Sequence, residues 1–115
     1  MNKTTWYERL ILARKLNGNG EKIKAYLIYQ DISIDDFKFD KYGYGDYEYY
    51  IVDKVKFLIE KAVLETEVGN NPDLSIKYLE QALESLDGME SVYPYIKINE
   101  VKILKEEFTS INNKM

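Results

Sequence analysis

The sequence contains no cysteine and no histidine among its 115 residues. Without cysteine, the chain forms no disulfide, carries no thiolate nucleophile and offers no cysteine ligand to a metal. Without histidine, it lacks the side chain that most often transfers protons near neutral pH, so only carboxylates, lysines and tyrosines remain for acid–base catalysis. We therefore expect a protein that is not an enzyme.

Long hydrophobic runs are also missing. Near the N-terminus, where apolar residues follow a lysine, Glu8, Arg9 and Arg14 interrupt them. A secretory signal needs an unbroken apolar core of about 7 to 15 residues, and a membrane-spanning helix needs about 20. We expect a cytoplasmic protein without a membrane partner.

The composition does supply enough apolar surface for a core. Hydrophobic residues make up 45% of the chain and charged residues 31%, a balance that argues against a disordered protein. The length is typical of one compact domain, and no stretch resembles a linker long enough to separate two cores. We expect a single domain over residues 1–115.

Apolar residues recur at helical spacing in five segments, and turn signals such as NGNG at 17–20 and Pro72 separate them. This pattern predicts an all-α fold, a five-helix bundle built from αα-hairpins. The helices are expected at about residues 5–17, 21–32, 50–68, 72–86 and 95–111. The residues expected in the core are Leu10, Leu27, Val55, Leu58, Ile59, Leu79, Leu83, Val101, Leu104 and Phe108.

The segment between the second and third predicted helices breaks this rhythm. Phe37 and Phe39 alternate with charged residues, as do Tyr47 and Tyr49, and two glycines lie between the pairs. Such alternation favours a small β-hairpin or an irregular tyrosine-rich loop. The alternative is a short helix that starts at Ser33, because an acid three residues later resembles a capping box.

Two of the predicted helices share a set of residues that lie 50 positions apart. The shared positions are Gly20, Ala25, Tyr29 and Ile32 in the first copy, and Asn70, Ser75, Leu79 and Ala82 in the second. The pattern resembles the second helix of a tetratricopeptide-type hairpin, in which small residues allow two helices to approach closely. The resemblance covers residues 5–33 and 50–87, and it implies two helical hairpins. A plain helical bundle explains the same matches.

Cofactor and metal motifs do not emerge from the sequence. The pairs Asp31 with Asp35 and Asp36 with Asp40 would share a helix face and could hold a cation, but acids near a helix start are more often a solvated surface. The glycines of NGNG lack the continuation of a phosphate-binding loop. We therefore expect no cofactor and no metal ion.

Charge is distributed unevenly along the chain. Residues 1–30 carry six basic and two acidic side chains, whereas residues 31–53 carry seven acidic side chains and two lysines, in a protein of net charge −4. The basic residues are scattered over two predicted helices, and the acidic remainder opposes phosphate contacts, so direct nucleic-acid binding is not expected.

The acidic segment also holds seven aromatic residues, five of them tyrosines. Tyrosine offers a large contact area with few rotamers, and carboxylates around it attract a basic partner. The sequence therefore predicts a surface that binds a basic protein; alternatively, the aromatic residues cover one end of the bundle and the acids keep it soluble. The candidate partner-binding residues are Asp36, Asp40, Tyr42, Tyr44, Asp46, Tyr47, Glu48, Tyr49, Tyr50 and Asp53.

In general character the chain resembles small acidic inhibitors, such as bacterial immunity proteins that block a nuclease toxin or phage proteins that mimic nucleic acid on a defence enzyme. Tyr49 and Tyr50, next to acids, are similar to the paired tyrosines of nuclease immunity proteins. This resemblance implies an inhibitor of a basic nuclease, toxin or defence enzyme. The resemblance to tetratricopeptide hairpins implies instead a helical adaptor or regulatory subunit.

Overall fold

The computed structural model describes residues 3–37 and 46–114, with residues 3–5 described by their backbone alone. Within these ranges the chain forms five α-helices and two short 3-10 helices, and no β-strand. The all-α fold with five helices that the sequence predicts is confirmed. The single domain predicted from the length stays a prediction, because residue contacts divide the chain into two units, Met1–Lys38 and Phe39–Met115.

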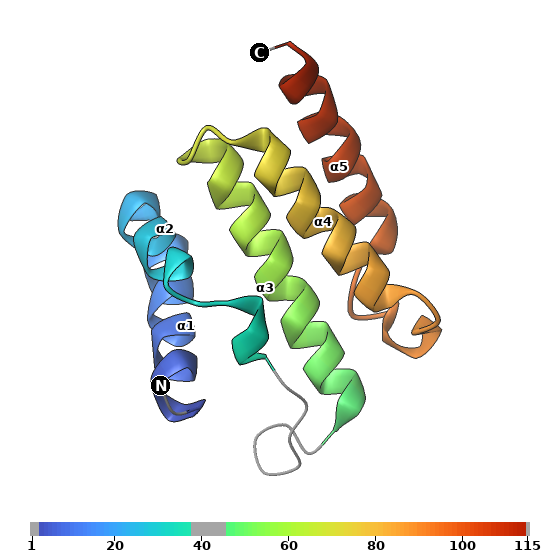
Figure 1. The fold of residues 1–115 in the computed structure, drawn as a ribbon. Helices are drawn as coiled ribbons and strands as arrows, with labels where there is room; N and C mark the ends of the chain where they lie inside the picture. The colour runs from blue at the N-terminus through green and yellow to red at the C-terminus, as the bar shows by residue number, and fades with distance from the viewer. Residues whose placement is uncertain (1–2, 38–45, 115) are drawn as a thin grey trace. The chain divides into compact units, whose positions relative to one another are not determined.

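Both units contain a helical hairpin, and the second unit adds a further helix (Figure 1). The elements of the first unit are α1 (Lys3–Gly18), α2 (Lys22–Gln30) and η1 (Ile34–Asp36). Those of the second unit are α3 (Tyr47–Glu67), α4 (Pro72–Leu86), η2 (Glu90–Val92) and α5 (Ile98–Asn113). In the second unit α4 lies between α3 and α5 and packs against both (Figure 1).

The first hairpin turns at the NGNG sequence. Gly20 adopts a φ of 84°, a left-handed conformation that glycine reaches without steric cost. The backbone N–H of Glu21 then donates to the Leu16 carbonyl at 2.9 Å and joins the end of α1 to the start of α2. Ala13 and Ala25 are fully buried, and their small side chains allow the two helices to approach closely.

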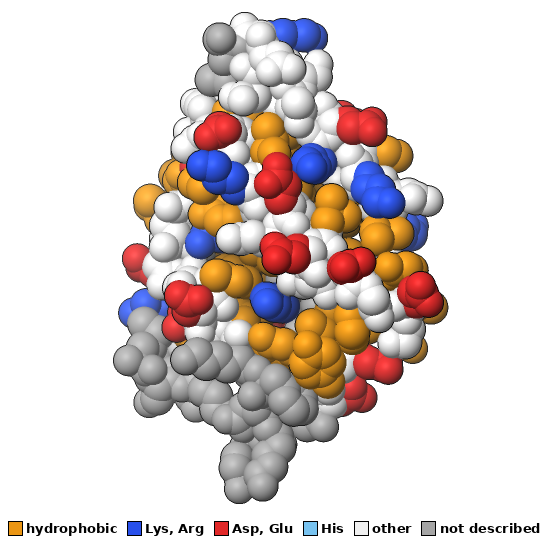
Figure 2. Space-filling model, turned by 45° about the vertical axis from the view of Figure 1, so that its right-hand side comes forward, with side chains coloured by type: hydrophobic (Ala, Val, Ile, Leu, Met, Phe, Trp, Pro, Cys, Tyr) orange, Lys and Arg blue, Asp and Glu red, His pale blue; other side chains and the backbone are white. Residues whose placement is uncertain are grey.

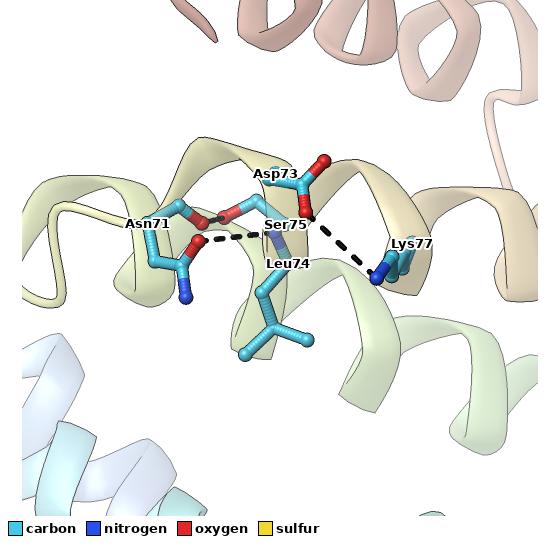
Figure 3. A network of polar contacts seen from close by, with 5 residues as sticks. All are labelled: Asn71, Asp73, Leu74, Ser75 and Lys77. Atoms are coloured by element: carbon cyan, nitrogen blue, oxygen red, sulfur yellow. Dashed lines mark hydrogen bonds and ion pairs between the residues drawn. The ribbon is translucent and has the colours of Figure 1, made fainter. Parts of the chain in front are cut away.

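The second hairpin turns in a similar way, with a polar network at the start of α4 (Figure 3). Asn70 takes the left-handed conformation, and the side-chain oxygen of Asn71 accepts the Leu74 N–H at 3.3 Å as the N-cap of α4. The buried Ser75 hydroxyl donates to the Asn71 carbonyl at 3.2 Å and accepts a hydrogen bond from the Thr66 hydroxyl of α3 at 2.7 Å. The small Ser75 side chain therefore allows α3 and α4 to approach closely. Its buried hydroxyl group makes two hydrogen bonds within the hairpin.

The shared residues that lie 50 positions apart have the same environment in both hairpins. Gly20 and Asn70 are both left-handed turn residues. The other positions are fully buried in each copy: Ala25, Tyr29 and Ile32, and Ser75, Leu79 and Ala82. The two helical hairpins expected from this pattern are therefore present, and the shared residues are the ones that let each pair of helices pack.

The segment between α2 and α3 contains a short helix and no β-hairpin in its described part. The backbone N–H of Ser33 donates to the Asp36 carboxylate at 3.0 Å, and the Ser33 hydroxyl accepts the Asp35 N–H at 3.1 Å. The capping box of the alternative prediction is thus confirmed, although the helix is a single 3-10 turn. The predicted β-hairpin is wrong for Tyr47 and Tyr49, because both belong to the first turn of α3.

The predicted core is confirmed at most positions. Leu10, Val55, Leu58, Leu79, Val101 and Phe108 are buried, and Ile59, Leu83 and Leu104 are half-buried. The prediction that Leu27 lies in the core is wrong, because its side chain is 61% exposed. The helix α2 is apolar on two sides, and the buried side carries Ala25 and Tyr29. The small Ala25 side chain allows α1 to approach closely, and the Tyr29 ring supplies a large buried surface.

Leucine-to-alanine substitutions in the two hairpins test this packing. We expect Leu79→Ala, at a fully buried position in α4, to lower the free energy of unfolding by about 2 to 5 kcal/mol. We expect Leu27→Ala, at an exposed position in α2, to change it by no more than about 0.5 kcal/mol. Urea denaturation followed by circular dichroism measures both values, and equal losses would contradict the orientation of α2.

Candidate protein-binding site

The site begins with the residue that starts α3. Asp46 has an extended backbone, and one of its carboxylate oxygens accepts the backbone N–H groups of Glu48 at 2.8 Å and Tyr49 at 3.3 Å. An aspartate in this position satisfies donors that the helix itself leaves without a partner. The tyrosines that follow are therefore held on a helical turn, which fixes the direction of their side chains.

The two tyrosines on this turn are exposed, whereas the next one is buried. Tyr47 and Tyr49 are 49% and 54% exposed, but Tyr50 is only 8% exposed. The ring of Tyr47 lies 5.7 Å from that of Tyr50, with an angle of 45° between the planes. We call residues Asp46, Tyr47, Glu48 and Tyr49 the acidic–aromatic turn, since all four are exposed on one turn of helix.

Tyr50 anchors this turn to its surroundings. Burial raises the pKa of its phenol above the usual value, and the nearby phenol of Tyr47 raises it further. The Lys54 ammonium group lies 5.9 Å from the centre of the Tyr50 ring, a distance that suits a cation–π contact. Tyr50 is therefore a packing residue that supports its exposed neighbours.

The other predicted site residues are found in different places. Asp53 is buried on α3, and Asp36 caps η1 in the first unit through its bond with Ser33. Asp40, Tyr42 and Tyr44 lie outside the described residues. Of the ten predicted residues, the structure thus brings the four of the acidic–aromatic turn together on an exposed surface.

The carboxylates of this turn stabilise α3 and also give the exposed surface a negative charge. Asp46 caps α3, and Glu48 lies in the first turn, where a negative charge complements the positive end of the helix dipole. On the face shown in Figure 2, by contrast, acidic and basic side chains are interspersed among hydrophobic ones. The acidic–aromatic turn can therefore contact, attract and hydrogen-bond a cationic partner.

A charged cluster further along α3 was not anticipated from the sequence. Lys61 is buried, and its ammonium group lies 5.5 Å from the centre of the Phe57 ring and 5.1 Å from that of Tyr78 on α4. Burial raises the pKa of the Tyr78 phenol, and the charge of the buried Glu65 raises it further. The four-residue spacing of 57, 61 and 65 was the available signal, because residues four apart share one face of a helix.

The described residues offer no cluster of three or more metal-ligating side chains. Of the acidic pairs considered from the sequence, Asp31 caps the end of α2, and Asp35 and Asp36 lie in η1, while Asp40 is outside the described part. Within the same described ranges, no helix has the length and hydropathy that are needed to cross a bilayer.

The N-cap of α3 can be tested by substitution. We expect Asp46→Ala to lower the free energy of unfolding by about 1 kcal/mol, because two N–H groups at the helix start lose their acceptor. Asp46→Asn should preserve most of the stability, since asparagine caps a helix about as well as aspartate. Urea denaturation of both variants checks the prediction, which fails if alanine is as stable as asparagine.

The burial of Tyr50 predicts a dependence on alkaline pH. Its folded pKa lies above the unfolded value of 10.0, so stability is fully present below pH 10.0 and is lost as pH rises above that value and through the folded pKa. We expect Tyr50→Phe to lose stability less steeply than the unmodified protein between about pH 9 and about pH 11. Urea denaturation across this range gives the slopes, with Tyr49→Phe as a control that removes an exposed phenol from the same turn.

Comparison with known protein families, with curated proteins and with solved structures finds no match. The resemblances to tetratricopeptide hairpins and to small acidic inhibitors therefore rest on the residues that carry them. Among the described residues, the acidic–aromatic turn is the most distinctive part of the exposed surface.

Proposed function

We propose that the protein is a small acidic inhibitor that binds a basic protein partner through the acidic–aromatic turn. The observation that carries this proposal is the exposure of Tyr47 and Tyr49 on a capped helical turn, next to a tyrosine that is buried. Aromatic rings that the fold does not bury are available as binding anchors, and tyrosine is enriched among the residues that dominate interface energies.

The rigidity of the turn supports the proposal. Since Asp46 caps α3 and Tyr50 packs beneath the turn, the backbone that carries Tyr47 and Tyr49 is ordered before a partner arrives. A preorganised contact surface loses less conformational entropy on binding than a flexible one. The exposed tyrosines would then contribute most of their contact energy to affinity.

The charge of the turn indicates the kind of partner. Asp46 and Glu48 flank the two tyrosines, and residues 31–53 as a whole carry seven acids against two lysines. Such a field attracts a basic surface and accelerates association, while it repels acidic competitors. A basic nuclease, toxin or defence enzyme in the cytoplasm is the class of partner that fits, and inhibition would follow from covering its cationic surface.

A helical adaptor is the second candidate, and two observations favour it. The two hairpins share a left-handed turn residue and the same buried positions, as expected for repeated helical units. In addition, α4 and α5 border a groove of about 470 Å³, which is lined by Leu83, Lys102, Lys105, Glu106 and Thr109. A groove between neighbouring helices can receive a peptide segment of a partner.

The proposed inhibitor surface predicts the effect of removing its tyrosines. We expect the partner, captured from extracts of the host cell, to bind Tyr47→Ala and Tyr49→Ala more weakly by at least about 1 kcal/mol each. The circular dichroism spectrum should remain unchanged, because both rings are half exposed. Tyr95→Ala, which removes an exposed tyrosine from another part of the same unit, is the matched control.

The charges are tested separately by association kinetics. The double variant Asp46→Asn, Glu48→Gln keeps the helix cap but removes two charges, so we expect slower association and a penalty that shrinks as salt screens exposed charges. Glu84→Gln with Glu107→Gln makes the same change in net charge elsewhere. If the partner binds all these variants equally well, the site lies elsewhere, and the α4–α5 groove becomes the leading candidate.

A further inference from the structure

The helix α2 is apolar on two opposite sides. One side buries Ala25 and Tyr29, and the other presents Ile23 and Leu27, which are 68% and 61% exposed. A helix that is apolar all round is normally covered all round, because exposed isoleucine and leucine lose the free energy of burial. The exposed side of α2 is therefore unusual for a helix that solvent alone surrounds.

Exposed aliphatic residues are concentrated on the same hairpin. Four of the six exposed isoleucines and leucines among the described residues lie in α1 and α2, although this hairpin belongs to the smaller unit. The four residues are Ile11, Leu12, Ile23 and Leu27. Single exposed apolar residues are common, whereas contiguous ones mark an interaction surface, and Ile23 and Leu27 lie one helical turn apart on the same face.

The charges within α2 are basic. The helix contains Lys22 and Lys24 and no carboxylate, and the acids lie at its two ends, where Glu21 forms an ion pair with Lys24 at 3.1 Å and Asp31 is the C-cap. Lys15 lies in the last turn of α1, next to the turn that leads into α2. A hollow of about 420 Å³ lies at the start of the helix, where residues 20–24 line it.

We propose that the exposed side of α2, Ile23 and Leu27 with the lysines beside them, binds an acidic amphipathic helix of a partner protein. The two aliphatic residues are one helical turn apart, so they can contact the apolar stripe of a helix laid along them. The lysines complement acids that flank such a stripe, and the hollow beside Ile23 can receive a side chain of the incoming helix. A symmetric contact between two copies of α2 would instead bring like charges together.

A membrane surface is the less suitable occupant. Binding to an anionic bilayer requires a helix that buries a broad apolar face in the lipid, in addition to basic residues. Here α2 has nine residues, its opposite side is buried in the protein, and only two large aliphatic side chains point outward. Recognition of one helix by another needs no more than such a short stripe.

This surface shares no residue with the acidic–aromatic turn, and its lysines carry the opposite charge. The proposal therefore does not depend on the proposed function, and either can fail alone. If both are correct, the protein connects a basic partner to an acidic one.

The test uses the full chain labelled with ¹⁵N and two synthetic helical peptides of about 18 residues. Both peptides carry the same leucine stripe, flanked by glutamates in one and by lysines in the other. We expect the glutamate peptide to shift the amide signals of α2 and the lysine peptide to have no effect. Equal binding of both peptides, or binding of neither, would overturn the proposal, as would shifts caused only by anionic phosphatidylserine vesicles or only by raising the protein concentration.

Variants then locate the contact. Ile23→Glu and Leu27→Glu should each weaken binding of the glutamate peptide about tenfold. Each variant removes an aliphatic side chain that the peptide would bury and adds a charge of the same sign as the peptide. Lys15→Glu with Lys24→Glu should weaken it further and remove its dependence on salt. Ile103→Glu, at a similarly exposed isoleucine of α5, is the matched control and should leave binding unchanged. If the control weakens binding as much as Ile23→Glu does, the peptide is not bound at α2.

Discussion

Close approach of paired helices at small buried side chains is the constraint on which this structure depends. In each hairpin an alanine of the first helix and an alanine or serine of the second are fully buried, so the backbones can lie near each other. A larger side chain at Ala13, Ala25, Ala62 or Ser75 would hold the helices apart. The left-handed residues Gly20 and Asn70 bring the chain back at the required distance. This packing sets the orientation of each helix, and the orientation determines which side chains are exposed.

The orientation of α2 and α3 explains where the functional surfaces lie. Because Ala25 and Tyr29 turn inward, Ile23 and Leu27 must turn outward, although they are the more hydrophobic pair of side chains. In α3 the burial of Tyr50 and Ile51 has the matching effect on Tyr49, which turns outward, whereas Tyr47 shares the face of Tyr50 and contacts its ring while remaining half exposed. Both proposed surfaces are thus consequences of core packing, and their chemistry is opposite: one is aliphatic and basic, the other aromatic and acidic.

The sequence allowed the helices to be predicted well and their faces less well. Periodic apolar residues, together with NGNG and Pro72, indicated five helices, because these signals are local. The buried side of α2 was not predictable in this way, since two stripes compete and the choice depends on which one fits the neighbouring helix.

The alternation of Tyr47 and Tyr49 with acids is compatible with a strand, but the first turn of a helix tolerates the same residues. The cap at Asp46 decides the outcome, because its carboxylate accepts the N–H groups of Glu48 and Tyr49 at the start of the helix. For the site, the composition of residues 46–50 was visible in advance. Which of its tyrosines remained exposed was not, because exposure depends on contacts with residues distant in the sequence.

The position of the single tryptophan provides a way to observe one unit separately. Trp6 is buried in the first unit, where its ring centre lies 4.6 Å from that of Phe37 and 5.6 Å from that of Tyr7. Its fluorescence therefore responds to unfolding of residues 1–38, whereas far-ultraviolet circular dichroism is dominated by the longer helices of residues 39–115. Denaturation curves from the two signals coincide if the units unfold together and separate if they do not. The chain thus carries an intrinsic optical reporter of the cooperativity between its two parts.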